Sequence, residues 1–94
     1  AELSRSWQRR LAVVRGVLAG EPLVMLDEPT AGLSEDEADE VLAVIERASK
    51  SAAFLVVTHH QRHARRIGND VLLLGGGRIV AAADAPAFFE GRLP

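Results

Sequence analysis

The spacing of hydrophobic positions changes several times along the chain, and each change marks a predicted element. Residues 4–19 have a helical pattern, with apolar side chains three or four positions apart on one face: Trp7, Leu11, Val14 and Leu18. Ser4 can cap the start of this helix, and Gly20 can end it. We expect the apolar face, Trp7 included, to pack into the core.

Two shorter runs, at residues 23–27 and 54–57, are apolar almost throughout instead of alternating. Such runs are typical of strands covered on both faces in a parallel sheet. A helix is predicted between them at residues 35–49, because Ser34 and Glu37 have the spacing of a capping box. Its buried stripe would consist of Val41, Leu42, Ile45 and Ala48. Strand, helix and strand in this order predict a right-handed βαβ unit in an α/β fold.

The rest of the chain predicts three further elements. A short basic helix covers residues 61–67, and a β-hairpin follows with strands at 71–74 and 78–81 around three glycines. Asp84 can cap a last helical turn at residues 86–90. No repeat or low-complexity stretch interrupts this order, so residues 1–94 are expected to form one compact unit.

Composition narrows the class of protein. The chain has 94 residues, of which 48% are hydrophobic, and a net charge of −2 with acidic and basic residues interspersed. This balance argues against a nucleic-acid-binding tail or a membrane-surface helix, and no apolar run is long enough to span a membrane. Cysteine is absent, which excludes disulfides and thiolate metal sites in these residues.

Polar side chains follow both apolar strands at the point where each strand ends. Asp27 and Glu28 follow the first, and Thr58 and His59 follow the second. Ligands of open α/β sheets bind outside the carboxyl ends of the strands, so we expect a carboxylate pair and an imidazole in one crevice. This set suits phosphate chemistry: one carboxylate for Mg²⁺, one to orient an attacking water, and a histidine at the terminal phosphoryl group. The simpler alternative is a turn-capping Asp beside a solvated Glu.

Three stretches resemble one family of nucleotide hydrolases. LVMLDEPTAGLS resembles the Walker B segment and D-loop of ATP-binding cassette (ABC) ATPases, and FLVVTHH resembles their H-loop strand. LSRSWQRRLAVVRGVLAGEP resembles their signature helix. The order and spacing also match, so the resemblance implies an α/β fold that forms part of a P-loop NTPase, with buried parallel strands, flanking helices and a C-terminal β-hairpin.

The resemblance implies a role for individual residues. Asp27 matches the aspartate that supports Mg²⁺, Glu28 the catalytic glutamate and His59 the switch histidine at the γ-phosphate. Ser4 matches the signature serine, while the D-loop that crosses to a partner subunit contains Ala31, Gly32 and Leu33. The implied cofactors are ATP and Mg²⁺.

The resemblance also implies partners and a location. They are a second nucleotide-binding subunit in a head-to-tail dimer and a transmembrane permease subunit, with no nucleic acid. The protein would be cytoplasmic and peripheral at the inner face of the cell membrane, where it couples ATP hydrolysis to solute transport.

Two departures from the family pattern change this expectation. No GxxxxGK[ST] phosphate-binding loop occurs, and the chain begins with Ala1, so it resembles the C-terminal part of a nucleotide-binding domain and is expected to be inactive alone. Arg5, Ser6 and Trp7 stand where the family favours two glycines and a glutamine. We therefore expect chemistry at the subunit's own ATP to survive, and the signature donated to the partner's ATP to be weakened.

Several alternatives remain open. The chain could belong to a non-hydrolysing regulatory or interaction module with a degenerate ABC fold, or to a soluble ABC ATPase that does not drive transport. His59, His60 and His63 could form a metal cluster, but we favour surface positions for His60 and His63. The three arginines at positions 62, 65 and 66 are interpreted as a solvated helix face.

Overall fold

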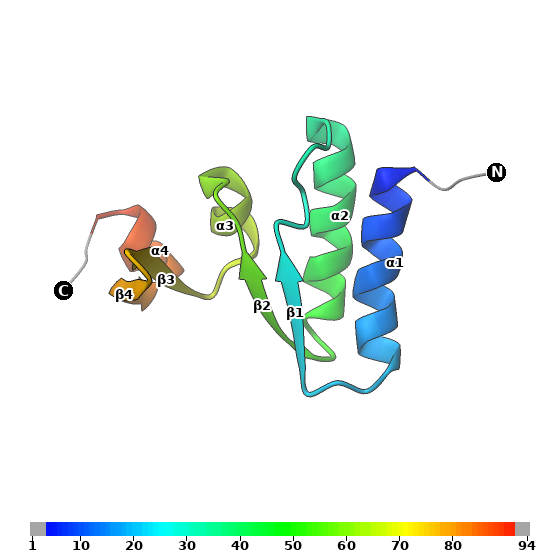
Figure 1. Ribbon diagram of the computed structural model, residues 1–94, viewed down its shortest axis with the longest axis horizontal. Helices are drawn as coiled ribbons and strands as arrows, with labels where there is room; N and C mark the ends of the chain where they lie inside the picture. Colours follow the sequence, from blue (N-terminus) through cyan, green and yellow to red (C-terminus); the bar gives the residue numbers. More distant parts are fainter. Residues whose placement is uncertain (1–3, 92–94) are drawn as a thin grey trace. The chain divides into compact units, whose positions relative to one another are not determined.

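All predicted helices and strands are present in the computed structural model, which describes residues 4–91. The prediction of one compact unit was wrong: the chain divides into two compact units, the first ending at His59 and the second beginning at His60. The first contains α1 (Arg5–Leu18), β1 (Leu23–Asp27), α2 (Glu35–Ala48) and β2 (Ala53–Val57) (Figure 1). The second contains α3 (Gln61–Ile67), β3 (Asp70–Gly75), β4 (Arg78–Asp84) and α4 (Ala85–Phe89).

The two strands of the first unit pair directly and in parallel, as the βαβ pattern predicted. Leu23 lies opposite Ala53 at one end, and Asp27 lies opposite Val57 at the other. The carboxyl ends of β1 and β2 therefore lie at the same edge of the sheet, which places their following residues side by side.

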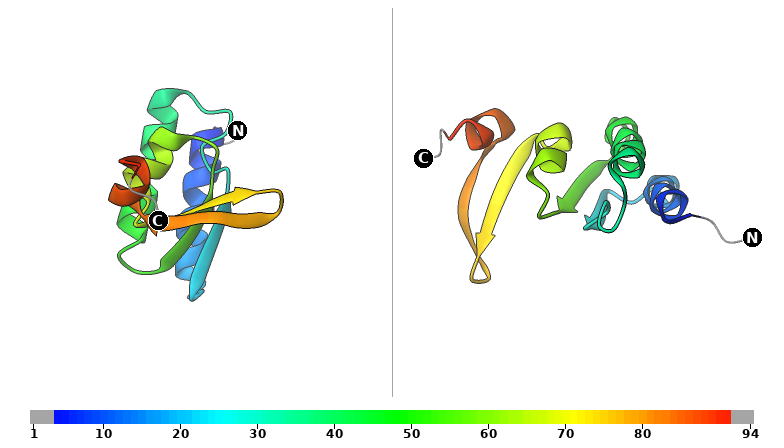
Figure 2. Two further views of the ribbon diagram at one scale, coloured as in Figure 1. Left: turned by 90° about the vertical axis from the view of Figure 1, so that its left-hand side faces the viewer. Right: turned by 90° about the horizontal axis from the view of Figure 1, so that it is seen from above.

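The helices of this unit pack side by side, and both run opposite to the strands (Figures 1 and 2). Their core consists of aliphatic side chains from three elements: Val13, Val24, Val41, Leu42 and Ile45. Gly16 lets α1 approach β1 closely, because a Cβ atom at this position would lie 2.9 Å from Cγ1 of Val24. The predicted stripe of α2 is confirmed at three positions, and Ala48 is half-buried.

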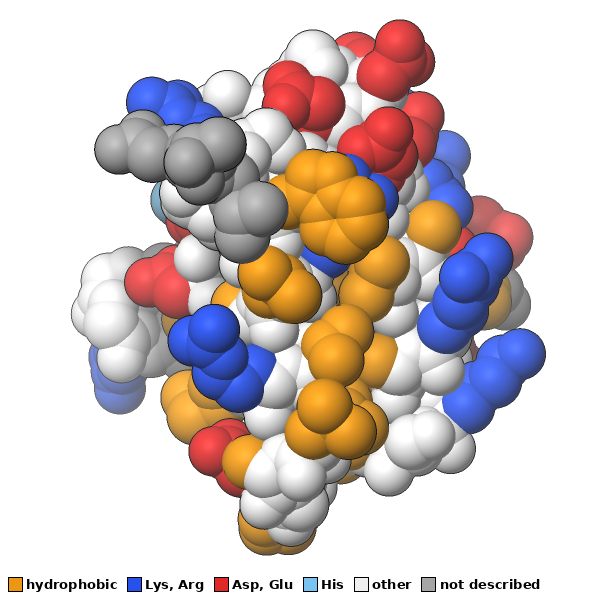
Figure 3. All heavy atoms as spheres, turned by 90° about the vertical axis from the view of Figure 1, so that its right-hand side faces the viewer, with side chains coloured by type: hydrophobic (Ala, Val, Ile, Leu, Met, Phe, Trp, Pro, Cys, Tyr) orange, Lys and Arg blue, Asp and Glu red, His pale blue; other side chains and the backbone are white. Residues whose placement is uncertain are grey.

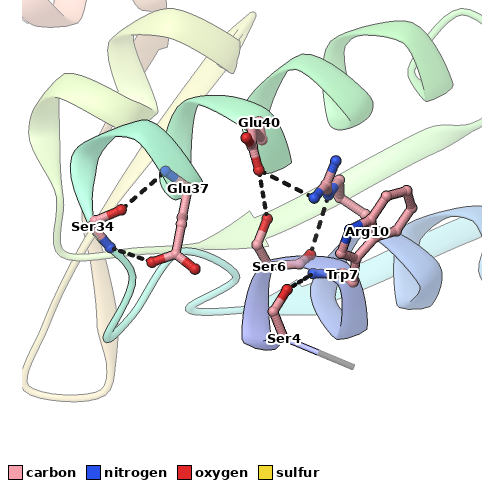
Figure 4. Close-up of polar contacts among 7 residues, drawn as sticks. All are labelled: Ser4, Ser6, Trp7, Arg10, Ser34, Glu37 and Glu40. Atoms are coloured by element: carbon pink, nitrogen blue, oxygen red, sulfur yellow. Dashed lines mark hydrogen bonds and ion pairs between the residues drawn. The ribbon is translucent and has the colours of Figure 1, made fainter. Parts of the chain in front are cut away.

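The start of α2 is set by a capping box. The Ser34 hydroxyl accepts from the Glu37 backbone N–H, and the Glu37 carboxylate accepts from the Ser34 backbone N–H, both at 3.2 Å (Figure 4). The reciprocal bonds satisfy two backbone donors that a helix start otherwise leaves unpaired. They therefore fix where the loop after β1 ends.

The apolar face predicted for α1 is on the surface of the described chain, so that prediction was wrong. Trp7, Leu11, Val14 and Leu18 have exposed fractions of 51, 37, 41 and 81%. Figure 3 shows the resulting hydrophobic stripe from the side of α1. The buried residues of α1 are instead Ser6 and Val13, on the face that also contains Gly16. Small side chains at this interface let α1 lie close to α2 and β1.

The expectation that the strands would be covered on both faces also fails within residues 4–91. Val24 is buried, whereas Leu23 and Met25 on either side of it are exposed. Leu55 and Val57 of β2 are exposed as well, and alternate with half-buried neighbours. Side chains alternate between faces of a strand, so one face of this sheet is covered and the other is open.

The second unit contains the predicted hairpin. β3 and β4 pair in antiparallel fashion, with a register shift between Leu73 and Leu74. Gly76 and Gly77 form the tip with φ of +57° and +75°, a left-handed pair that suits a two-residue hairpin turn. The Asp84 carboxylate accepts from the Ala87 backbone N–H at 2.8 Å, as predicted for the cap of α4.

His63 corrects one expectation in the second unit. Its side chain is buried, with 3% exposed, and its ring stacks on that of His60 with centroids 3.6 Å apart. The prediction of a surface position is therefore confirmed for His60, which is exposed. It is wrong for His63, because the His63 ring is buried and stacked on the His60 ring. Among residues 4–91, no helix combines the length and hydrophobicity that a membrane span requires.

Candidate functional site

Two acidic residues stand where β1 ends. Asp27 is the last residue of the strand and is exposed, opposite Val57 of β2. The Glu28 backbone N–H donates to the Val57 carbonyl at 2.7 Å, which extends the pairing of the strands by one residue. Glu28 then adopts φ of +49°, the one non-glycine residue with positive φ in the described chain. This left-handed conformation costs roughly 1–2 kcal/mol and turns the chain sharply out of the sheet.

The Glu28 side chain contacts His59. Oε1 of Glu28 lies 3.3 Å from Nε2 of His59, although the histidine side chain is 97% exposed. The same oxygen is shielded from solvent and has no hydrogen-bond partner within residues 4–91. The His59 ring and Oε1 of Glu28 are therefore close to each other but not aligned for a hydrogen bond. A carboxylate oxygen of Glu28 is thus able to accept a hydrogen bond from a further group.

The donor set of this edge suits a magnesium ion. Asp27 and Glu28 offer carboxylate oxygens, which are the ligands that Mg²⁺ prefers in proteins. The shielded Oε1 of Glu28 fits an acceptor for a water molecule, and the exposed His59 ring can reach a ligand outside the sheet edge. Asp27 could therefore hold the metal while Glu28 holds the water.

The loop after Glu28 is a compact turn. Pro29 and Thr30 are buried, and the Ala31 backbone N–H donates to the Glu28 carbonyl at 3.1 Å. Gly32 has φ of +76°, which favours glycine there. Ala31 and Gly32 are exposed and Leu33 is half-buried, so the predicted D-loop residues lie at the surface, directly before α2.

Sequence reasoning missed Arg9 of α1. Its Nη1 donates to the carbonyls of Glu28 at 3.1 Å and Pro29 at 2.7 Å, and its Nη2 donates to the Ala31 carbonyl at 3.2 Å. A signal was available in the sequence. Arg9 shares a helical face with Ser6 and Val13, at spacings of three and four, but the hydrophobic periodicity pointed to the face of Trp7 and Leu11 instead.

One of the altered signature residues, Ser6, is part of the contact between α1 and α2. Ser6, with 2% of its surface exposed, donates to Oε2 of Glu40 at 3.0 Å (Figure 4). Nη2 of Arg10 lies 3.1 Å from the same oxygen, and its guanidinium carbon lies 4.0 Å from the centre of the Trp7 ring. Trp7 therefore stacks with a cation on the surface of the described chain, and Ser6 ties the two helices together.

The other two signature residues lie at the start of α1. Ser4 is the N-cap, and its hydroxyl accepts from the Trp7 backbone N–H at 3.2 Å. Arg5 is exposed and lies beside the D-loop. A Cβ atom at Gly32 would lie 3.1 Å from Nη1 of Arg5. The structure thus brings Asp27, Glu28 and His59 together at the sheet edge, with Arg5 next to the loop that follows.

Comparison with known proteins identifies relatives along nearly the whole chain, although no protein-family model matches it. The chain is 39% identical over 92 residues to the glutamate/aspartate import ATP-binding protein GltL of Escherichia coli, covering 96% of the chain. It is 36% identical to the thiamine import ATP-binding protein ThiQ of Mesorhizobium japonicum over 99% of the chain. It is 33% identical to the glutamine transport ATP-binding protein GlnQ of Geobacillus stearothermophilus over 96% of the chain.

A solved structure shares the fold. A dimeric ATP-binding cassette in a post-hydrolysis state, bound to ADP and phosphate, superposes with a TM-score of 0.71 at 24% identity. The match covers 88% of this chain and 36% of that one. The chain likewise spans 38% of the length of each of the three curated relatives. The chain therefore belongs to the ABC ATPase family, and it matches part of the length of these ATP-binding proteins.

Proposed function

We propose that this chain is part of an ATP-hydrolysing subunit that couples Mg-ATP hydrolysis to solute transport through an ABC transporter. One observation carries the proposal: Glu28 and His59, which follow two directly paired parallel strands, lie 3.3 Å apart at the edge where Asp27 also ends its strand. The names of the relatives, which are import and transport ATP-binding proteins, support the transport role.

Each residue of this edge has a proposed task. Asp27 supports Mg²⁺, which when bound neutralises charge on the phosphate oxygens. Glu28 accepts a hydrogen bond from the attacking water through its shielded oxygen and orients that water. His59 is exposed enough to contact the terminal phosphoryl group from the neighbouring strand. Orientation of the water and of the phosphoryl group is the main contribution that a protein can make to this reaction.

The remaining parts of a complete site would come from polypeptide outside these 94 residues. The sequence contains no GxxxxGK[ST] loop, so another segment would cradle the phosphates. Residues 1–94 would thus be the C-terminal part of a nucleotide-binding domain, inactive when isolated. The exposed D-loop residues Ala31 and Gly32, with Leu33, would face a second nucleotide-binding subunit. A permease subunit would hold the pair at the cytoplasmic face of the membrane.

The test is to replace Glu28 by glutamine in the native polypeptide that contains this chain. Glu28→Gln keeps the size of the side chain but weakens its ability to accept a hydrogen bond from water. We expect the rate of ATP hydrolysis to fall at least about 100-fold while Mg-ATP binding is retained. Glu21→Gln, at an exposed position before β1, is the matched control and should leave the rate unchanged. Equal rates for Glu28→Gln and the unsubstituted protein would exclude Glu28 as the catalytic carboxylate.

A non-hydrolysing module is a second candidate, favoured by the altered signature. Ser6 places a side chain, already bonded to Glu40, where the family favours a glycine that lets the backbone approach phosphate. Arg5 adds a positive charge that could partly replace this approach. Nucleotide titration combined with turnover separates the candidates, since binding without hydrolysis by the unsubstituted native polypeptide would support the module.

A further inference from the structure

The side chain of Arg9 holds the turn that carries Glu28 from outside. Arg9 extends from α1, and its two terminal nitrogens donate to the carbonyls of Glu28, Pro29 and Ala31 at 2.7–3.2 Å. These three carbonyls belong to four consecutive residues. The planar guanidinium presents several N–H donors in fixed directions, which suits carbonyls that converge on one point.

This turn needs an external support. Glu28 holds φ of +49°, a conformation that non-glycine residues rarely adopt and that persists only when the surroundings impose it. Within the backbone, the bond from Ala31 N–H to the Glu28 carbonyl closes the turn, and the bond from Glu28 N–H to Val57 ties it to β2. Arg9 adds a link to α1, a third element.

The contact leaves the reactive part of Glu28 free. Arg9 bonds to the main-chain oxygen of Glu28, whereas the carboxylate faces His59. A cation bonded to the carboxylate itself would compete with a water molecule for its oxygens. A cation bonded to the backbone fixes the direction of the side chain without that competition.

We propose that Arg9 is a positioning residue: it clamps the turn of residues 28–31 so that the Glu28 carboxylate is aimed at the attacking water. The proposal rests on the proposed function for its catalytic meaning. Arg9 touches no reacting atom, and acts through the backbone of the turn. Loss of the clamp is expected to impair the chemical step more than nucleotide binding, because Glu28 acts on water and not on ATP.

The experiment compares three variants of the native polypeptide. Arg9→Gln removes the charge and the fork of donors, Arg9→Lys keeps the charge but not the fork, and Arg15→Gln makes the same charge change at an exposed position of the same helix. We expect kcat of ATP hydrolysis to fall at least about tenfold in Arg9→Gln, with KM within about threefold, and to fall less in Arg9→Lys. Arg15→Gln should match the unsubstituted protein.

Hydrogen exchange supplies a readout that does not need turnover. Exchange of the backbone amides of Glu28 and of residues 30–33 should accelerate in Arg9→Gln, while the amides in the middle of α2, around Val41 and Leu42, stay unchanged. The same unchanged exchange in α2 shows that the variant is folded. Should Arg9→Gln fail to fold, Arg9→Lys serves for both measurements.

The outcomes separate the two proposals. If Glu28→Gln abolishes turnover but the Arg9 variants leave kcat and exchange unchanged, the clamp is refuted and the proposed function stands. If Arg9→Gln lowers kcat, raises KM and also accelerates exchange in α2, the variant is destabilised as a whole, and the clamp is again refuted. If Glu28→Gln leaves turnover unchanged, the proposed function is refuted, and so is the role of Arg9 in positioning a catalytic carboxylate.

Discussion

The hydrogen bond between Ser6 and Glu40 predicts how much a substitution in the altered signature changes the free energy of unfolding. Ser6 is 2% exposed and donates to the Glu40 carboxylate at 3.0 Å, which joins α1 to α2. A hydrogen bond to a charged group contributes about 1.5–3 kcal/mol when buried. The Glu40 side chain is 52% exposed, so solvent competes for it, and we expect Ser6→Ala to cost about 1–1.5 kcal/mol.

The neighbouring ion pair should contribute less. The side chains of Arg10 and Glu40 are 20% and 52% exposed, and pairs of this kind contribute up to about 1 kcal/mol. Arg10→Met keeps much of the packing on Trp7 and should therefore cost less than Ser6→Ala. Ser6→Gly, which restores the residue favoured by the family, should cost only about 0.5 kcal/mol more than Ser6→Ala, because Ser6 lies in the first turn of α1 and the full penalty for glycine applies to a helix interior.

The assay is urea unfolding of the native polypeptide followed by circular dichroism. A double-mutant cycle of Ser6→Ala with Glu40→Ala should give a coupling free energy of about 1 kcal/mol, because the two residues are in direct contact. A coupling near zero, or a cost of Ser6→Ala below about 0.3 kcal/mol, would refute the reasoning that Ser6 serves the packing of α1 on α2.

Three further predictions concern the first unit and use the same unfolding measurement. Leu42→Ala opens a cavity at a side chain that is 1% exposed and should cost about 2–5 kcal/mol, whereas Leu18→Ala, at 81% exposed, should change stability by less than about 0.5 kcal/mol; equal costs would contradict the assigned core. Ser34→Ala removes half of the capping box and should cost about 1 kcal/mol, and no change would mean that the cap is replaceable by water. Gly16→Ala places a Cβ atom 2.9 Å from Val24 and should cost about 1–3 kcal/mol despite the better helix propensity of alanine; a stabilised variant would show that α1 can move away from β1.

Much of the fold followed from local pattern. The bounds of β1 and α2 were predictable because a short apolar run and a capping box are both local signals. The meeting of Glu28 with His59 was predicted for a topological reason: residues that follow neighbouring parallel strands lie at one edge of the sheet. The sequence by itself therefore determined the elements, their order and the meeting of Glu28 with His59.

The tertiary structure decided which surfaces meet. Periodicity located an apolar face on α1 at Trp7 and Leu11, but the face that packs in the described chain is that of Ser6 and Val13. Hydrophobic spacing reports which side chains avoid water, whereas close packing of a helix also depends on how near the backbones can come, and Gly16 allows that approach. The same contact brings Arg9 onto the turn at Glu28. That interaction joins residues 19 positions apart, and no local pattern encodes it, because only the packing of α1 places donor and acceptors within reach.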